Sequence, residues 1–283
     1  MSISGADNLM ILVRTALLDA LDALEDHSDS IIVVGAQAVY LHTGSALVAL
    51  AESTTDSDLA INGLTLAGDP LINEAMIAAG IEPHKDANRV GTYVTGSGIE
   101  VDLLVPEGIN QGPGRRAAVV SPHPRTSMRR ALGLEAALVD NAPMDIPSLD
   151  PNDNRSVRAR VAGPSALIVA KMHKISERLS DSKRRSDKDA HDVYRMLVAC
   201  PTDELADVLA RLADDAIAGE ATRRALQILD ELFASSPQAP GSTMAGRAET
   251  GVGDPALVSA QTQALSEDLM GAFRNRNHMD SPQ

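Results

Sequence analysis

Aromatic residues are scarce in this chain, which has no tryptophan, three tyrosines and two phenylalanines. Proteins that bind single-stranded nucleic acid without sequence preference stack the bases on aromatic side chains. Any nucleic-acid contact made by this chain is therefore expected to depend on phosphates and shape. Cysteine is nearly absent as well. Cys200 is the one cysteine, so an internal disulfide is excluded and a reducing cytoplasm fits.

Positive charge is in the minority, and long apolar runs are missing. The formal net charge of −14 argues against a general nucleic-acid coat, because phosphate binding needs clustered lysine and arginine. A local basic groove stays open. No run reaches the roughly 18 apolar residues that span a bilayer, and the start MSISGADNLM lacks the charged region and cleavage pattern of a signal peptide. We therefore expect a cytoplasmic protein with no membrane partner.

The first 160 residues alternate between helical and strand-like patterns. Apolar residues at helical spacing predict an amphipathic helix over residues 7–26, and the β-branched run 31–34 predicts a buried strand. Alternation predicts a hairpin from 89–95 and 99–105, with a type II′ turn at Gly96-Ser97. The other predicted elements of this half are helices over 36–42 and 69–79, strands over 57–62, 116–121, 134–139 and 144–149, and a second hairpin around 140–143.

After about residue 160 the pattern becomes helical throughout. Pro164 suits the first turn of a helix. The predicted helices cover 164–179, 187–199, 203–218, 220–234 and 255–273, and the stretch 235–254, rich in Ser, Pro, Gly, Ala and Thr, is typical of a linker. We therefore predict an α/β (α+β) N-terminal domain with a mixed sheet over residues 1–160, an all-helical domain over 161–235, and a linker with a terminal helix over 236–283.

The sharpest local feature is Asp56-Ser57-Asp58, at the start of a predicted strand. Residues i and i+2 of a strand point to the same face, so Asp56 and Asp58 are expected to lie side by side and repel each other. A divalent cation between them relieves that repulsion, and all-oxygen ligation suits Mg²⁺ or Mn²⁺. A D-x-D sequence also occurs often by chance, so alone it is a weak signal.

Asp102 lies in the strand-like segment 99–105, between apolar neighbours. A charge in such a segment is costly unless it is paired or binds a metal. A neighbouring strand could bring Asp102 beside Asp56 and Asp58. Two ions about 4 Å apart could then activate an attacking hydroxyl and hold a triphosphate. The alternative is that Asp102 is an exposed residue at a strand edge.

A strand, a glycine and a helix are expected to follow one another around Val34-Gly35-Ala36. Backbone N–H groups at such a helix start can hold phosphate, and glycine lets the phosphate approach closely. An ordinary tight turn between strand and helix has the same pattern. The order of the motifs is more informative: strand, glycine turn, helix, D-x-D strand and then Asp102.

In this order of motifs the sequence resembles the nucleotidyltransferase superfamily that includes DNA polymerase β and the minimal nucleotidyltransferases. The resemblance implies metal-binding and catalytic roles for the three carboxylates, with an NTP as co-substrate. It implies nucleotide-binding roles for Gly35, Ala36, Gln37 and Thr54. Ala36 stands where the superfamily has Ser or Gly, so Gln37 or Thr54 would take the place of the missing hydroxyl.

Three helical segments, 166–174, 177–178 and 188–194, resemble the AbiEii/MenT group, which are nucleotidyltransferase-like toxins of type IV toxin–antitoxin systems. The resemblance spans residues 31–230. It implies that Lys171 and Asp189 complete the active site as catalytic residues, with Lys171 also binding the nucleotide phosphates. It further implies the 3′ end of tRNA as the acceptor, growth arrest as the outcome, and a cognate antitoxin as a partner.

The helical half also has a plainer interpretation. Lys171, Lys174 and Arg178 fall on one helical face, which is typical of a solvated helix surface as well as of a phosphate site. Asp189 equally suits a local ion pair with a neighbouring arginine. Two other functions stay open. A small-molecule nucleotidyltransferase, like the aminoglycoside-modifying enzymes, would use the same carboxylates, and Ala36 leaves room for a catalytically silent nucleotide-binding or antitoxin-binding module.

Overall fold

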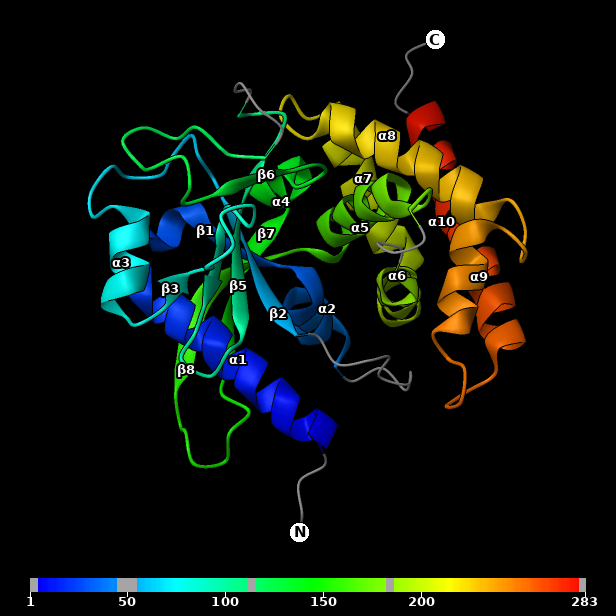
Figure 1. Cartoon of the computed structure of the whole chain (residues 1–283). Coiled ribbons are helices and arrows are strands. Elements are labelled where there is room, and N and C mark those ends of the chain that lie inside the picture. Colours follow the sequence, from blue (N-terminus) through cyan, green and yellow to red (C-terminus); the bar gives the residue numbers. More distant parts are fainter. Residues whose placement is uncertain (1–4, 45–54, 111–115, 182–185, 280–283) are drawn as a thin grey trace. The chain divides into compact units, whose positions relative to one another are not determined.

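The computed structural model describes residues 5–44, 55–110, 116–181 and 186–279 of the chain. Two compact units make up the protein: Met1–Ala38 with Ser53–Ala162, and Val39–Glu52 with Gly163–Gln283. The first unit contains a mixed sheet and the second is helical, as Figure 1 shows. The predicted fold class, an α/β region followed by an all-helical region, is confirmed.

The first unit contains one mixed sheet with the strand order β3-β4-β5-β2-β1-β8-β7. Strand β6 also pairs with β5, from Leu104 onward, after the part of β5 that pairs with β4. The pairs β1–β8, β2–β5 and β5–β6 are parallel, and the other pairs are antiparallel. The strands are β1 Ile31–Val34, β2 Asp56–Ile61, β3 Glu82–Pro83, β4 Thr92–Val94, β5 Glu100–Pro106, β6 Arg129–Ala131, β7 Asn141–Pro147 and β8 Ser156–Ala162.

The helices of this unit explain which way the strand side chains point. Helix α1 (Gly5–Ala23) packs against β2, β5 and β8. Ser57 faces this helix, because its hydroxyl donates to the carbonyl oxygen of Val13 at 3.2 Å. Strand alternation then turns Asp56 and Asp58 to the opposite face of the sheet. The remaining helices are α3 Ile72–Ala78 and α4 Glu135–Val139, with a 3₁₀ turn over Glu25–Ser30 after α1. Helix α2 (Gly35–Thr43) begins in this unit, and its residues from Val39 onward belong to the second.

The predictions for two segments of this unit were wrong. The strand predicted over 116–121 is absent, because this segment has only an isolated bridge at Ala117. The second segment is 134–143. Residues 135–139 form helix α4 and not a strand, and no hairpin turns at 140–143, because β7 begins at Asn141. Glu135, Ala136 and Ala137 are good helix formers, and a short apolar run does not distinguish a buried helix from a buried strand. The actual hairpin pairs β7 with β8, a strand whose alternation in Ser156–Ala162 was missed.

The hairpin between β4 and β5 forms as predicted, but its turn differs. The left-handed residue is Gly98, with φ +82°, and not Gly96. The Gly98 N–H donates to the carbonyl of Thr95, and the Thr95 N–H donates to the carbonyl of Ile99. The loop is therefore a three-residue connection that closes with a left-handed glycine, and the type II′ prediction was wrong.

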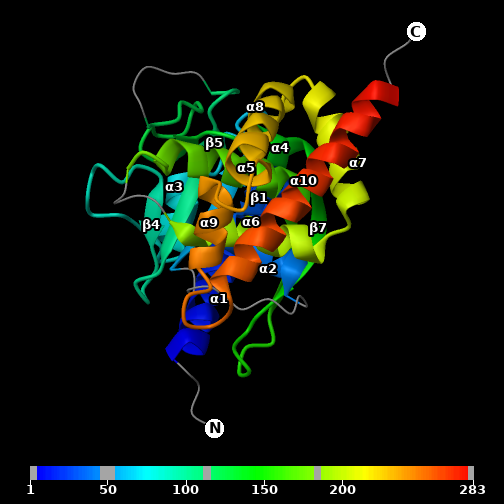
Figure 2. The same ribbon diagram turned by 90° about the vertical axis from the view of Figure 1, so that its right-hand side faces the viewer.

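The second unit consists of helices that pack on one another. Figure 2 shows α10 beside α9 and α7, which it contacts along with the π-helical turn at Asp230–Ala234. The helices are α5 Pro164–Arg178, α6 Asp187–Ala199, α7 Thr202–Asp214, α8 Gly219–Leu229, α9 Pro240–Arg247 and α10 Pro255–Met279. Among the residues with described positions, no helix combines the length and apolar character that a bilayer crossing requires.

The stretch 235–254 differs from the linker interpretation, because it contains helix α9. Two of its glycines, Gly241 and Gly246, are sites of close packing. A Cβ on Gly241 would collide with the ring of Phe233, and one on Gly246 would collide with the carbonyl oxygen of Pro255. At these two positions neighbouring groups leave no room for a larger side chain. The resulting composition is similar to that of a flexible linker, which explains the wrong prediction.

Two buried histidines hold the loop that leads into α3. His123 accepts the Ile72 N–H at its Nδ1 (3.2 Å) and faces the carbonyl oxygen of Ala67 with its Nε2 (2.9 Å). His27 reaches the carbonyl oxygen of Pro70 at 2.8 Å, and the two rings lie 5.9 Å apart in a T-shaped arrangement. Burial and the neighbouring His27 hold the pKa of His123 below its ordinary 6.5. His123 therefore stays neutral at pH 7.

We expect acid to destabilise the first unit through His123. Because the folded-state pKa lies below the unfolded value of 6.5, this stabilisation is complete above pH 6.5 and is lost as the pH falls through the folded-state pKa. Protonation removes the acceptor for the Ile72 N–H, at a cost of about 1–3 kcal/mol. Urea unfolding at pH 7.5 and 5.0 measures the loss. His123→Asn should show a smaller loss, and an equal loss in both proteins would contradict the assignment.

Candidate metal centre

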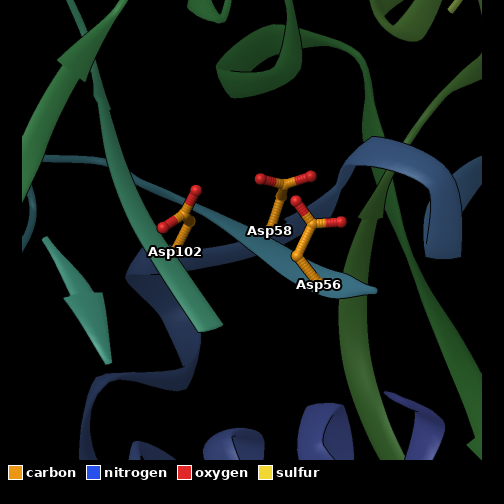
Figure 3. Close-up of side chains that lie close together, drawn as sticks. All are labelled: Asp56, Asp58 and Asp102. Carbon is orange, nitrogen blue, oxygen red and sulfur yellow. The ribbon is translucent and has the colours of Figure 1, made fainter. Parts of the chain in front are cut away.

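Three carboxylates from two neighbouring strands meet on one face of the sheet. Strands β2 and β5 run parallel with Asp58 directly beside Asp102, and Asp56 lies two residues before Asp58 on the same face. One carboxylate oxygen of each residue lies within 4.8 Å of the other two. Figure 3 shows the three side chains gathered over the two strands. The predicted neighbourhood of Asp102 and the D-x-D pair is therefore present.

Asp102 is the buried member of this triad, and both of its oxygens have donors. Its residue is 6% exposed, whereas Asp56 and Asp58 are half-buried. The Thr92 hydroxyl donates to Oδ1 at 2.6 Å, and a guanidinium nitrogen of Arg129 donates to Oδ2 in an ion pair. Asp102 is therefore not the exposed strand-edge residue of the alternative interpretation.

Gly35 allows the start of α2 to approach Asp58. Strand β1 pairs antiparallel with β2 so that Val34 lies opposite Asp58, and the chain turns into α2 at the next residue. Gly35 has φ +67°, and a Cβ at this position would lie 2.9 Å from Cγ of Asp58 and still closer to its Oδ2. Both the backbone conformation and the close approach therefore require glycine.

The donor set of the triad fits a hard divalent cation. All three groups are carboxylates, and oxygen ligands of this kind suit Mg²⁺ or Mn²⁺. Gathering three anionic groups within 4.8 Å raises their mutual repulsion, which a cation relieves. The residues present therefore fit the ion that the sequence predicts.

Two further residues with predicted nucleotide-binding roles lie at the start of α2. Ala36 and Gln37 follow Gly35 in the first turn of this helix. The Gln37 side chain is 1% exposed, and its Oε1 accepts a hydrogen bond from Nε of Arg14 at 2.8 Å. This side chain is fixed inside the first unit, so a contribution to phosphate binding falls to the backbone N–H groups. Thr54 lies outside the described residues.

Lys171 and Asp189 lie together in the helical unit, in a buried cluster that also contains Asp192. The Lys171 ammonium donates to Asp189 at 2.8 Å and to Asp192 at 2.6 Å, and all three residues are buried. Burial favours the neutral amine, but the attraction of the two carboxylates outweighs it and raises the pKa of Lys171. Burial likewise disfavours the Asp189 carboxylate, but Lys171 and Lys174 outweigh it and lower the pKa of Asp189. Both groups are charged at neutral pH.

Two further cations of α5 reach the same carboxylate from outside. Lys174 lies 3.1 Å and Arg178 3.6 Å from oxygens of Asp189, and their side chains are 37% and 31% exposed. Asp189 thus contacts three cations. Asp189 therefore makes ion pairs, as in the plainer interpretation, with Lys171, Lys174 and Arg178 of α5.

Thr92 and Arg129 are the residues at this site that sequence reasoning did not assign. Thr92 is the antiparallel partner of Asp102 on β4. The predicted hairpin therefore placed Thr92 near Asp102, but it did not indicate the hydrogen bond between their side chains. Arg129 lies in none of the predicted strands or helices. Its pairing followed only once β6 was known to lie parallel to β5, with Arg129 beside Leu104.

Comparison with known proteins finds remote structural likeness alone. No protein-family model matches the chain, and no curated protein matches it in sequence. The crystal structure of JHP933 from Helicobacter pylori has a TM-score of 0.40 and 12% identity, over 98% of this chain and 97% of that one. That of an antigenic nucleotidyltransferase-like protein from Paracoccidioides brasiliensis has a TM-score of 0.40 and 17% identity, over 77% and 93%. The site is therefore interpreted from its own residues.

Alanine at position 35 should destabilise the protein more than alanine at position 98. Both glycines have a positive φ, but nothing lies within 4 Å of a Cβ on Gly98, so Gly98→Ala should cost only the left-handed backbone term of about 1–2 kcal/mol. Gly35→Ala adds the collision with Asp58 and should cost about 1–3 kcal/mol more. Urea unfolding measures both free energies. Equal losses would show that the close approach to Asp58 carries no energetic weight.

Replacing Lys171 by methionine should destabilise the helical unit strongly. The change leaves Asp189 and Asp192 buried without their shared ammonium, and breaking such a buried pair costs about 3–5 kcal/mol. Lys174→Met, which removes a partly exposed partner of the same carboxylate, should cost at most about 1 kcal/mol. Chemical denaturation of both variants tests the contrast. A small loss in Lys171→Met would mean that the cluster does not depend on its buried cation.

Proposed function

We propose that this protein is a metal-dependent nucleotidyltransferase, which moves an NMP from an NTP to an acceptor hydroxyl. The observation that carries the proposal is the meeting of Asp56, Asp58 and Asp102 within 4.8 Å of one another. The start of α2 lies against this triad, because Gly35 approaches Asp58. A carboxylate triad for a divalent ion beside a helix start for phosphate is the combination that NTP chemistry needs.

Each residue has a defined task in this reaction. Asp56, Asp58 and Asp102 would hold Mg²⁺ or Mn²⁺, which supplies Lewis-acid stabilisation of charge on phosphoryl oxygens. The backbone N–H groups after Gly35 bind the triphosphate. The acceptor hydroxyl gives up its proton to solvent and its oxygen attacks the α-phosphorus. The bond from the α-phosphorus to the oxygen bridging the α- and β-phosphates breaks, and pyrophosphate leaves. Asp102, at the buried end of the triad, positions the acceptor hydroxyl. Catalysis is then mainly positioning and electrostatics.

Lys171 and Asp189 enter the proposal through the resemblance to the AbiEii/MenT group. In that proposal Lys171 neutralises phosphate charge as pyrophosphate leaves, and residues 161–235 complete the active site. The 2.8 Å contact between Lys171 and Asp189 supports a role of Asp189 in orienting the ammonium. The two residues form an ion pair in the helical unit, and their catalytic roles stay predictions.

The acceptor is proposed from the same resemblance to be the 3′ end of tRNA. The protein would then act in the cytoplasm as the toxin of a toxin–antitoxin pair, with a cognate antitoxin as its partner. The partly exposed cations Lys174 and Arg178 support a phosphate-bearing acceptor. An aminoglycoside-like acceptor would use the same triad.

Asp58→Asn should reduce transfer at least about 100-fold, because it removes a charge on which transition-state stabilisation depends. Labelled NTPs are incubated with the protein, with Mg²⁺ or with EDTA, and with total tRNA or an aminoglycoside. Label in tRNA that requires Mg²⁺ is the expected result. Label in the aminoglycoside would identify a small-molecule enzyme.

Asp145→Asn is the matched control, because Asp145 is an exposed carboxylate on β7 that pairs with Arg158. It should leave transfer unchanged, and circular dichroism should show both variants folded. If a folded Asp58→Asn protein transfers label at the wild-type rate, the assignment of the triad is refuted. Magnesium-dependent NTP binding without transfer to any acceptor would indicate the catalytically silent module.

A further inference from the structure

The Arg129–Asp102 ion pair belongs to the metal centre, but Arg129 has no role in the proposed reaction. Asp102 is the buried member of the triad, and Arg129 donates to its Oδ2 while Thr92 donates to its Oδ1. A guanidinium stays protonated at every accessible pH. Loss of the guanidinium charge therefore does not break this ion pair, whereas movement of the Arg129 side chain does.

The backbone holds Arg129 in this position. Strand β4 covers the edge of β5 as far as Asp102, which pairs with Thr92, and β6 covers the same edge from Leu104 onward. Gly91 lies at the junction with φ +73°, and a Cβ there would lie 2.5 Å from the backbone nitrogen of Arg129. A glycine at position 91 thus leaves room for β6 to pair with β5 immediately after the part of β5 that pairs with β4. The first residue of β6 then reaches the carboxylate of Asp102.

A divalent ion at the triad and the Arg129 guanidinium compete for the same carboxylate. Arg129 occupies Oδ2 of Asp102, and two cations a few ångströms apart repel each other strongly away from bulk water. The Arg129 side chain is 31% exposed. Its guanidinium can therefore move toward solvent without passing through the core. An ion bound by Asp102 therefore favours a different position of Arg129.

A second arginine–carboxylate pair on the same strand provides an internal comparison. Glu100 lies two residues before Asp102, and both terminal nitrogens of Arg89 donate to its carboxylate, one of them at 2.6 Å. Among the described residues, Glu100 is not part of the group of carboxylates that could hold a metal. Arg89 therefore resembles Arg129 in chemistry and location, but the carboxylate with which it pairs is not one of the three in the triad.

We propose that Arg129 is a counter-ion built into the metal centre: it balances Asp102 in the metal-free protein and is displaced when a divalent ion binds. The inference rests on the proposed metal-dependent function. Arg129 then weakens the intrinsic affinity for the ion and keeps the buried carboxylate paired until the ion arrives. Its displaced guanidinium becomes available to a phosphate group of the substrate or acceptor.

Mn²⁺ binding to the full-length protein tests the proposal, with the electron paramagnetic resonance signal of free Mn²⁺ as the readout. Arg129→Gln keeps a donor for Asp102 but loses the charge, and should bind Mn²⁺ at least about tenfold more tightly than wild type. Arg129→Met, which has neither charge nor donor, should change in the same direction. Arg129→Lys retains the charge and should stay within about threefold of wild type.

Two controls separate this inference from the metal assignment itself. Arg89→Gln should leave Mn²⁺ affinity unchanged, and Asp102→Asn should abolish or strongly weaken it. If wild type binds Mn²⁺ through Asp102 but the neutral variants bind equally or more weakly, the counter-ion proposal is overturned while the metal centre stands. If neither wild type nor Arg129→Gln binds Mn²⁺, the metal centre falls and this inference with it. Binding by Arg129→Gln alone would support the proposal.

Discussion

The parallel pairing of β2 with β5 brings like charges together, and the rest of the site adjusts to that constraint. It places Asp58 directly beside Asp102, with Asp56 on the same face. Anionic groups this close are unfavourable unless cations or donors compensate them. The compensation comes from the adjoining strands, since Thr92 belongs to β4 and Arg129 to β6. On the other side, β1 ends beside Asp58 and turns at Gly35, where a side chain would not fit.

The site residues were predictable to the extent that strand alternation determines them. Asp56 and Asp58 had to share a face, and Asp102 had to be buried or bound among its apolar neighbours. The sequence could not fix which strands are neighbours. Pairing between β2 and β5 is parallel and spans about forty residues of chain, and no local turn sets its register. Thr92 and Arg129 gained their roles from that register alone.

The errors in the fold have a related physical cause, because small residues have several uses. Ala136 and Ala137 belong to a buried helix where a strand was predicted. Gly241 and Gly246 pack closely against Phe233 and Pro255, in a stretch whose composition indicated a linker. A glycine or alanine permits flexibility, tight packing or a special backbone conformation, and its neighbours in space decide which. Larger apolar residues carry clearer periodic signals, and the bounds of helices α5 and α6 were accordingly predicted to within one residue.

The two units solve the same electrostatic problem in comparable ways. Asp102 is held by Arg129 in the first, and Asp189 and Asp192 are held by Lys171 in the second. In both, a buried carboxylate is paired with a cation of the chain. A ligand that takes either cation away from its carboxylate breaks a buried ion pair, and this costs several kcal/mol unless a new partner replaces the lost one. A metal ion at Asp102 is such a replacement. The Lys171 ammonium already donates to Asp189 and Asp192, which leaves one of its three N–H donors for a further acceptor such as a phosphate oxygen.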